Sequence, residues 1–342
     1  MDPVAVLRRI ALELERGGAA AYRVRAFRRA AAVLADLPDD EVARRAADGS
    51  LTDLPGLGRT TAGVVSDAVA GREPAYLTEV AASGSALPDG GPLSAALRGD
   101  CHTHSDWSDG GAGIGEMAAA AREIGHEYLV LTDHSPRLTV AGGLSAARLR
   151  AQLDVLAGLN ADLAADPAGG APPIRVLSGI EVDILADGGL DQDPDLLAEL
   201  DVVVASVHSD LRMPAGRMTT RMVAAVSNPH VDILGHCTGR LRTRRGRPES
   251  EFDADAVFTA CREHGVAVEI NSRPERRDPP RRLLRRAREI GCRFAVDSDA
   301  HTPGQLSWQP YGCARALDCG IGPADVVNTM PAGELLRWTR RR

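Results

Sequence analysis

Residues 99–110 read GDCHTHSDWSDG and contain two histidines one residue apart, His102 and His104, together with three aspartates. The first five residues predict a short strand, and the polar residues follow where it ends. Such an end is either a polar turn that happens to contain histidine or the first part of a metal site. The rest of the chain decides between them, because a metal site needs further ligands from other segments.

Beyond residue 98, short apolar or β-branched runs alternate with amphipathic stretches. The predicted strands lie near residues 99–103, 127–132, 174–181, 201–207, 231–235, 266–270 and 292–297. The predicted helices lie near residues 114–124, 144–163, 193–199, 215–227, 253–264 and 279–289. Seven such βα units predict an α/β protein with a parallel sheet closed into a TIM-like barrel that lacks one unit. An open, doubly wound sheet is the alternative, although no GxGxxG follows the first strand.

Histidines and acidic residues recur where the predicted strands end. A lone histidine there is more often a hydrogen-bonded structural residue, and a loop aspartate is more often a turn former. Six of the nine histidines nevertheless fall at these ends. Because the carboxyl ends of barrel strands meet at one face, we predict a metal site there. Its predicted ligands are His102, His104, Asp109, His134, Glu181, His208, His236, Asp299 and His301.

This ligand set is too large for a single ion. Imidazole binds Zn, Fe and Mn, and carboxylates bridge pairs of cations, so we expect two or three divalent ions of Mn, Zn or Fe. Neighbouring cations lower the pKa of a bound water towards ~7 and stabilise charge during phosphoester hydrolysis. We therefore predict a metal-dependent phosphoesterase and assign the catalytic roles to Glu181, His208 and Asp299.

Arginines near the same strand ends are candidates for phosphate binding, because the planar guanidinium pairs bidentately with phosphate oxygens. We predict substrate contacts from Arg240, Arg273 and Arg276, with Asn271 as an orienting group. The alternative interpretation of each arginine is a solvated surface charge with no role in substrate binding. The run RLRTRRGR (240–247) is interpreted as a solvated loop rather than a nucleic-acid reader, with a loop that follows a DNA backbone beside the metal site as the alternative.

Residues 1–82 read as a small all-α domain, and residues 83–98, rich in Gly, Ser and Pro, read as a linker to a barrel domain at 99–342. LPGLGRTTAGVV (54–65) resembles a helix-hairpin-helix, in which backbone amides approach a phosphate without sequence preference. We predict DNA contacts from Gly56, Gly58 and Arg59. Arg25 and Arg28, with Arg23 and Arg29, would add phosphate contacts. A purely structural or protein-docking domain is the alternative.

Seven motifs occur in the order found in the polymerase-and-histidinol-phosphatase (PHP) family of metal-dependent phosphoesterases. They are HTHSDWSDG (102–110), LTDHS (131–135), GIEVDIL (179–185), SVHSD (206–210), NPHVDILGHCTGR (228–240), EINSRPER (269–276) and DSDAH (297–301). Over about residues 98–335 the chain most resembles the PHP domain of bacterial family X DNA polymerases. Its N-terminal segment resembles the N-terminal domain of the same enzymes.

The resemblance implies a distorted (β/α)7 barrel and a grouping of the ligands. His102, His104, Glu181 and Asp299 would hold one metal. Glu181 would bridge to a second metal held also by His208 and His236. A third would be held by Asp109, His134 and His301.

Several functions are excluded or disfavoured. About 16 residues separate the two halves, too few for a polymerase palm, so we expect no polymerase activity. All 40 basic side chains are arginine, so no lysine can form the Schiff base of a lyase. A net charge of −7 argues against a chain-wide cationic coat. No long apolar run or secretory signal is apparent, and the six scattered cysteines suit reduced thiols in the cytoplasm.

The leading expectation is a monomeric enzyme of DNA repair that hydrolyses DNA ends or oligonucleotides, as a 3′–5′ exonuclease or 3′-phosphatase. The first alternative is a phosphatase of histidinol-phosphate type acting on a small phosphorylated metabolite. The second is a non-catalytic DNA-repair adaptor whose metals are structural.

Overall fold

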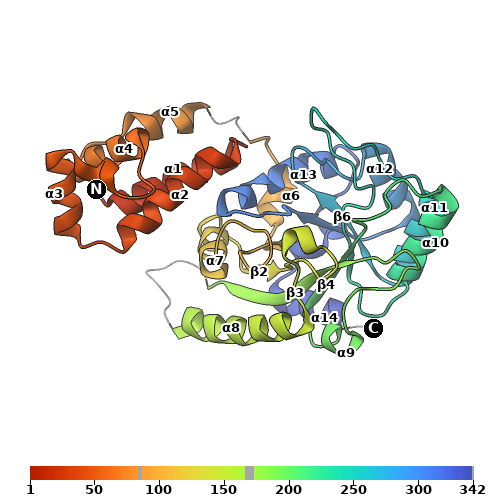
Figure 1. Cartoon of the computed structure of the whole chain (residues 1–342). Helices are drawn as coiled ribbons and strands as arrows, with labels where there is room; N and C mark the ends of the chain where they lie inside the picture. The colour runs from red at the N-terminus through yellow and green to blue at the C-terminus, as the bar shows by residue number, and fades with distance from the viewer. Residues whose placement is uncertain (84–86, 166–172, 341–342) are drawn as a thin grey trace. The chain divides into compact units, whose positions relative to one another are not determined.

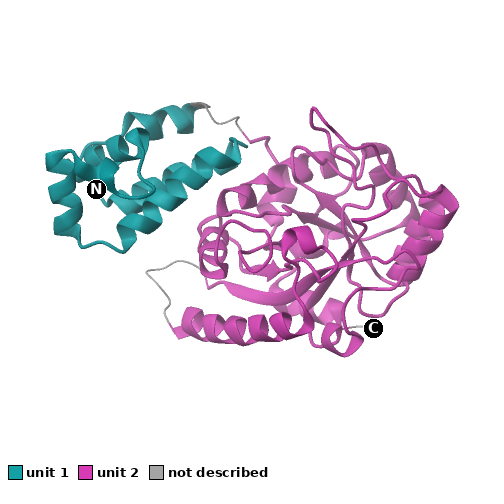
Figure 2. Ribbon diagram, viewed as in Figure 1, with its two compact units in different colours: residues 1–86 teal, residues 87–342 magenta. Residues whose placement is uncertain are grey.

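The computed structural model describes residues 1–83, 87–165 and 173–340, and the chain forms two compact units (Figure 1). Unit 1 comprises residues 1–86 and unit 2 comprises residues 87–342 (Figure 2). Each unit has a hydrophobic core of its own. No helix in the described part of the chain is long and apolar enough to cross a membrane.

Unit 1 is helical, as its apolar spacing predicts. Its elements are α1 (Pro3–Arg16), α2 (Ala21–Ala35), α3 (Asp39–Asp48), η1 (Ser50–Asp53), α4 (Arg59–Val69) and α5 (Ala75–Ser83). The Asp2 carboxylate caps α1 by accepting a hydrogen bond from the Val4 N–H at 2.9 Å. Leu7 and Ile10 of α1 pack with Phe27 of α2 in the core. The apolar faces of these short helices thus stabilise one another.

Unit 2 is built on seven strands. They are β1 (Gly99–Thr103), β2 (Tyr128–Leu131), β3 (Arg175–Asp183), β4 (Val202–Ser206), β5 (Ile233–Leu234), β6 (Ala267–Asn271) and β7 (Phe294–Asp297). Each strand pairs in parallel with the next, in the order β1 to β7. A parallel bridge between Thr103 and Ala300 joins the two ends of the sheet. The sheet is therefore a nearly closed, TIM-like barrel and not the open, doubly wound alternative.

Helices surround the strands, because the connections between parallel strands must cross a face of the sheet. They are α7 (Ile114–Glu123), α8 (Ala146–Ala165), α9 (Pro194–Leu197), α10 (Ala215–Val226), α11 (Ala254–Glu263) and α12 (Arg281–Ile290). Two helices beyond the last strand, α13 (Gln309–Leu317) and α14 (Ala332–Thr339), complete the unit (Figure 1). Leu335 and Trp338 of α14 pack with residues contributed by all seven strands.

The region predicted as a linker, 83–98, contains a helix in the structure. Residues 84–86 lie outside the described residues, whereas residues 91–96 form α6 (Gly91–Ala96), which packs against α13. The Gly, Ser and Pro content typical of a linker masks this element, because one fully buried side chain, Leu93, anchors it to the core of unit 2. The barrel unit thus begins before its first strand.

Candidate metal centre

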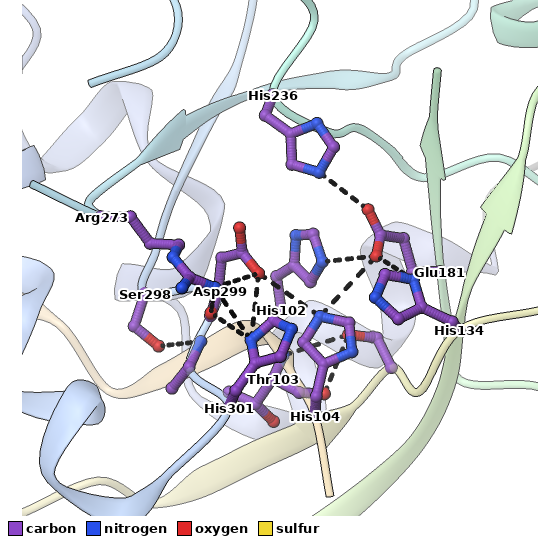
Figure 3. A network of polar contacts seen from close by, with 12 residues as sticks. His102, Thr103, His104, His134, Glu181, His236, Arg273, Ser298, Asp299 and His301 are labelled. Atoms are coloured by element: carbon purple, nitrogen blue, oxygen red, sulfur yellow. Dashed lines mark hydrogen bonds and ion pairs between the residues drawn. The ribbon is translucent and has the colours of Figure 1, made fainter. Parts of the chain in front are cut away.

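The nine predicted ligands lie together at the carboxyl ends of the strands, and Figure 3 labels all of them except Asp109 and His208, which contact His301 and Glu181 respectively. The imidazole rings of His104 and His301 are 4.2 Å apart between centroids, and those of His104 and His134 are 4.4 Å apart. The rings of His208 and His236 are 5.4 Å apart. Residues separated by up to two hundred positions in the chain therefore share one site.

Glu181 lies at the middle of this site. Its Oε1 is 2.9 Å from Nε2 of His236 and 3.3 Å from Nε2 of His208. Its Oε2 is 2.8 Å from Nδ1 of His134 and 3.3 Å from Nε2 of His102. The carboxylate is only 1% exposed. Because β3 extends to Asp183, Glu181 lies within the strand and not at the predicted strand end, which fixes its position firmly.

Asp299 and Asp109 lie on either side of the histidines. Oδ1 of Asp299 is 3.4 Å from Nε2 of His104. Its backbone has a φ of 54°, a left-handed conformation that costs a non-glycine residue about 1 kcal/mol or more and recurs at functional sites. Oδ1 of Asp109 lies 3.4 Å from Nε2 of His301 and 3.5 Å from Nε2 of His134. The two aspartates thus add anionic oxygens to both edges of the imidazole cluster.

The polar atoms of this site suit divalent cations. Both carboxylate oxygens of Glu181 and both ring nitrogens of His104, His208 and His236 are buried without a hydrogen-bond partner. Buried polar atoms normally have such partners, because leaving one unpaired costs about 1–3 kcal/mol. Lone pairs of nitrogen and oxygen that converge without intervening donors are the arrangement of metal ligands.

Three groups of these ligands have donor atoms within 4.8 Å of one another. The groups are His104, Asp109, His134 and His301; His102, His104 and Glu181; and His134, Glu181 and His208. The grouping implied by the family resemblance shares most of these members. The differences are that His104 and His134 each belong to two groups, and that Asp299 and His236 belong to none of the three.

Local charges hold the two central carboxylates ionised and His104 neutral, whereas other ligands are affected differently. Although burial opposes protonation of His102 and His208, Glu181 raises the pKa of His102 well above its usual value and that of His208 to about 9. Burial alone would raise the pKa of Glu181, but His102, His134 and His208 lower it well below its usual value. Burial likewise opposes ionisation of Asp299, whereas Arg276 and Arg273 bring its pKa well below the usual range. Burial lowers the pKa of His104, and the neighbouring His301 and His134 lower it further. The carboxylates are thus held ionised and His104 is held neutral.

Glu269 of β6 is a residue to which the sequence analysis gave no role. Its Oε1 lies 2.6 Å from Nδ1 of His102, and its Oε2 accepts a hydrogen bond from the backbone N–H of His236 at 2.5 Å. Carboxylates that accept from metal-binding histidines orient the ring and fix its tautomer. The available signal was a charged residue inside the otherwise apolar strand VAVEI, where a carboxylate must have buried partners.

Two further buried aspartates support the loops that carry ligands. Oδ1 of Asp183 accepts a hydrogen bond from the backbone N–H of His208 at 3.2 Å. Asp133 accepts hydrogen bonds from the Oγ atoms of Ser105 and Ser108, each at 2.6 Å. These contacts hold the 105–108 turn, which leads directly to Asp109.

Arg273, Arg276 and Asn271, three of the four predicted phosphate-binding residues, lie beside Asp299. The guanidinium of Arg273 extends between Asp299 and His301, with Nη1 3.0 Å from Nδ1 of His301 (Figure 3). Nε of Arg276 forms an ion pair with Oδ2 of Asp299 at 3.0 Å, and its Nη1 is buried without a hydrogen-bond partner. The side-chain amide of Asn271 donates to Oδ2 of Asp299 at 3.0 Å.

Arg240 does not have the substrate-facing role predicted for it. Its Nε donates to the carbonyl of Arg276 at 3.0 Å, and its Nη2 donates to the carbonyl of Arg277. Its Nη1 forms an ion pair with Glu249 at 3.0 Å. Because all three nitrogens already have partners in the protein, this arginine joins two loops and is not free to bind phosphate.

Some of the predicted DNA-contacting residues of unit 1 are exposed, whereas others pack against or pair with residues of the same unit. Gly58 caps α4, and its N–H donates to Oγ1 of Thr61 at 2.9 Å, while Arg59 and Arg25 are exposed. Gly56 has a φ of 105°, and a Cβ there would lie 2.8 Å from Nε of Arg29. The prediction for Arg28 needs correction, because its Nε pairs at 2.6 Å with the buried carboxylate of Glu15. Neutralising that acid is its structural role.

Both parts of the chain match known protein families. A model of the PHP domain matches residues 100–273, about half of the chain, and a model of a helix-hairpin-helix domain matches residues 1–73. The segment between the two matches is too short to hold a polymerase domain, since folded domains need at least about 50 residues.

Curated relatives agree with these matches. The chain is 42% identical over 245 residues to DNA polymerase/3′-5′ exonuclease PolX of Bacillus subtilis (strain 168), an alignment that covers 72% of this chain and 41% of that protein. It therefore spans less than half of that relative. It is 31% identical over 243 residues to a probable phosphatase of Thermoanaerobacter sp. (strain X514), covering 67% of this chain and 89% of the relative.

One similar solved structure is the histidinol phosphate phosphatase of Lactococcus lactis subsp. lactis, complexed with zinc, L-histidinol and phosphate. It has a TM-score of 0.45 and 18% identity, with coverage of 66% of this chain and 94% of the other. The family matches, together with the relatives, settle the class of this protein: the chain belongs to the PHP family of metal-dependent phosphoesterases and carries a helix-hairpin-helix domain ahead of its barrel.

Proposed function

We propose that this chain hydrolyses phosphate esters at DNA 3′ ends, as a 3′–5′ exonuclease or a 3′-phosphatase in DNA repair. The observation that carries the proposal is the pairing of two features in one chain. A buried centre of imidazoles and carboxylates lies next to Arg276, whose Nε pairs with Asp299 and whose buried Nη1 has no hydrogen-bond partner. A helix-hairpin-helix domain precedes it.

The nine ligand side chains would hold two or three divalent cations of Mn, Zn or Fe. These cations would supply the Lewis acidity and positive charge that phosphoester hydrolysis requires. Glu181 is the natural bridging ligand, because its two oxygens face different histidines. Asp299 adds a second carboxylate beside Nε2 of His104, at 3.4 Å from the atom that Glu181 approaches to 3.7 Å. His208 is about 12% exposed and lies where the site meets solvent.

The neighbouring polar groups would bind and orient the phosphate. Nη1 of Arg276 is buried without a hydrogen-bond partner beside the Arg276–Asp299 ion pair, and Arg273 lies between Asp299 and His301. A planar guanidinium in this position would hold two non-bridging oxygens in a fixed orientation. Asn271 would keep the Asp299 carboxylate aligned through its hydrogen bond at 3.0 Å. Glu181, His208 and Asp299 remain our candidates for the catalytic roles.

Unit 1 would supply affinity for DNA. Gly58 lies at the N-terminus of α4, where backbone N–H groups favour an anion, and Arg59 is the first residue of that helix. Arg25 is exposed on α2. Such contacts bind phosphates without reading sequence, which suits an enzyme that processes ends of any sequence.

A small phosphorylated metabolite is the second candidate substrate. The specific observation in its favour is the probable phosphatase of Thermoanaerobacter, which is matched along 89% of its length. That alignment covers 67% of this chain, whereas the helix-hairpin-helix match accounts for residues 1–73. We rank the DNA substrate first because a metabolite phosphatase has no evident use for that domain.

Comparing two substrates tests the proposal directly. The protein is loaded with Mn²⁺ and incubated with a 3′-labelled single-stranded oligonucleotide or with histidinol phosphate. We expect release of label from the oligonucleotide at the higher rate and its loss in His104→Ala, because His104 contacts both edges of the centre. A faster reaction with histidinol phosphate, or no hydrolysis with Mn²⁺, Zn²⁺ or Fe²⁺, would overturn the proposal.

A further inference from the structure

Residues 241–247, LRTRRGR, form a short hairpin that we call the arginine hairpin. Leu241 and Arg247 form an antiparallel bridge, and the N–H of Gly246 donates to the carbonyl of Thr243 at 2.8 Å. A Cβ at Gly246 would lie 2.5 Å from the carbonyl oxygen of Leu241, so the tight turn requires glycine. Four arginines and no acidic residue occur within this defined turn.

The arginine hairpin is attached to the loop that borders the metal centre. The N–H of Arg242 donates to the carbonyl of Glu275 at 2.6 Å, and Arg240 bonds to the carbonyl of Arg276 at 3.0 Å. The same loop carries the Arg276 side chain, 3.0 Å from Asp299. The hairpin therefore lies on the mouth of the barrel, directly outside the candidate phosphate-binding arginines.

The arginines of the hairpin are gathered within one turn. Some exposed arginines elsewhere pair with acids, as Arg44 does with Glu41 and Arg286 does with Asp255, whereas others in the described part of the chain, such as Arg150 and Arg212, do not. Within residues 1–83, 87–165 and 173–340, the side chains of Arg242, Arg244 and Arg245 have neither an ion pair nor a hydrogen bond. Like charges gathered without counter-ions favour a polyanionic partner.

A cleft of about 770 Å³ lies along one side of the hairpin. Arg240, Arg242, Arg247 and Arg282 contribute to its lining. Glu249 forms ion pairs with both Arg240 and Arg282, and Glu251 also contributes to the lining, so four arginines face two acidic residues and Arg242 has no ion pair with any residue that the structure describes. The cleft thus extends the basic surface beyond the hairpin itself.

We infer that the arginine hairpin binds the sugar-phosphate backbone of single-stranded DNA whose terminal ester lies at the metal centre. This inference rests on the proposed function. A DNA strand whose end is cleaved at the metal centre continues outward with further phosphate groups. The arginine hairpin lies just outside Arg273 and Arg276, the candidate phosphate-binding arginines, where these further phosphates would pass. The hairpin contains no aromatic residue, so we expect binding through charge without base stacking or sequence preference.

Charge reversal in the hairpin tests the inference against a matched control. Arg244→Glu/Arg245→Glu is compared with Arg175→Glu/Arg293→Glu, which changes the charge equally near the amino ends of β3 and β7, at the opposite end of the barrel. The substrates are a 3′-labelled 20-nucleotide oligothymidylate and the small diester thymidine 5′-(p-nitrophenyl phosphate). Melting temperatures of both variants confirm that the barrel is folded.

For the hairpin variant we expect kcat/KM on the oligonucleotide to fall about tenfold or more, mainly through KM. The slope of log kcat/KM against log salt should become shallower by about 1.4 if two phosphate contacts are lost. Hydrolysis of the small diester should stay unchanged. An equal loss in both variants, or an equal loss on both substrates, would overturn the inference.

Cross-linking separates this inference from the proposed function. Oligothymidylate carrying 4-thiothymidine is irradiated with the full chain in EDTA, and the modified peptides are identified by mass spectrometry. Cross-links at 240–247 that disappear in the hairpin variant support the inference even if wild-type protein hydrolyses neither substrate. Cross-links confined to other segments, or binding only of an oligouridylate of equal length, would contradict it.

Discussion

Glu269 connects ligands that come from two different strands. One of its oxygens accepts from His102 and the other accepts from the backbone of His236. In Glu269→Gln, one oxygen is replaced by an NH₂ group that faces a donor, so one buried donor loses its partner. We predict that this change weakens Mn²⁺ binding about 10- to 100-fold, as measured by isothermal titration calorimetry.

Glu289→Gln provides the control for this prediction. Glu289 pairs with Arg286 on the exposed surface of α12, and surface pairs of this kind contribute little to stability. Its substitution should leave the calorimetric titration unchanged. Equal Mn²⁺ affinities for Glu269→Gln and the unmodified protein would mean that Glu269 does not position His102.

The sequence could predict those site residues whose neighbours in the chain already indicate their position. The nine candidate ligands were identifiable because each follows or ends an apolar run. The roles of the arginines were not, because they depend on partners far along the chain. Arg240 bonds to Glu249 and two carbonyl groups through all three nitrogens, whereas Arg276 pairs with Asp299 through Nε and keeps Nη1 without a partner. Nothing in the local sequence separates those two cases.

At the scale of elements, the loop after β2 is held by a close contact between backbone segments. A Cβ at Gly143 would lie 1.8 Å from the carbonyl oxygen of Ser135, and the N–H of Leu144 bonds to the carbonyl of His134 at 2.7 Å. We predict that Gly143→Ala lowers the free energy of unfolding by more than about 2 kcal/mol, because the backbone beside His134 must move. Urea denaturation measures the change.

Gly158→Ala is the matched substitution. Gly158 is exposed in the interior of α8, and a Cβ there would meet no atom within 4 Å. Alanine should stabilise this helix by about 0.5–1 kcal/mol, because glycine loses more backbone entropy when it is ordered. A similar effect of alanine at both positions would show that the Ser135 contact is unimportant.

His126, just before β2, makes the stability of the barrel depend on pH. Burial lowers its pKa to about 4, although its hydrogen bond to Gln309 opposes the shift. The unfolded chain therefore binds more protons between about pH 6.5 and pH 4, and stability falls as the pH falls through that range. Between pH 7 and pH 5 the wild type should lose about 2 kcal/mol more than His126→Gln. Urea denaturation at both pH values tests this, and parallel losses would contradict it.

Element boundaries were predictable only approximately. The sequence analysis located all seven strands, but β5 spans only Ile233–Leu234 whereas the prediction was 231–235. The length of a strand depends on its hydrogen bonds to the adjacent strands, because a residue belongs to a strand only where a residue of a neighbouring strand pairs with it. Helix α6 escaped prediction because one buried side chain, Leu93, outweighs the Gly, Ser and Pro around it.

At the scale of the whole molecule, two separate cores predict two separate unfolding events. The ligands all belong to unit 2, so a bound cation stabilises that unit alone through mass action. Adding Mn²⁺ after treatment with EDTA should raise the barrel transition in differential scanning calorimetry. At 100 times Kd the gain is about 2.7 kcal/mol. The transition of unit 1 should not move.

The calorimetric result has a clear contrary outcome. If both transitions shifted by the same amount with Mn²⁺, the two units would unfold as one cooperative body. The variant His104→Ala serves as the control, because loss of a ligand should reduce the shift of the barrel transition without affecting unit 1.

The sequence could predict the number of βα units, but it could not predict that the first and last strands pair and close the barrel. Seven units suit both a closed barrel and an open sheet, and the choice depends on whether the first strand pairs with the last. That pairing joins Thr103 to Ala300, which no local pattern can indicate. The family resemblance favoured the correct alternative, since it carries information about the complete fold.

The pairing of Thr103 with Ala300 also links loading with cations to the order of synthesis. His102 and His104 leave the ribosome long before Asp299 and His301 are synthesised, so the growing polypeptide offers an ion only part of its coordination shell. We expect the complete set of ligands to form once β7 has emerged and docked onto β1.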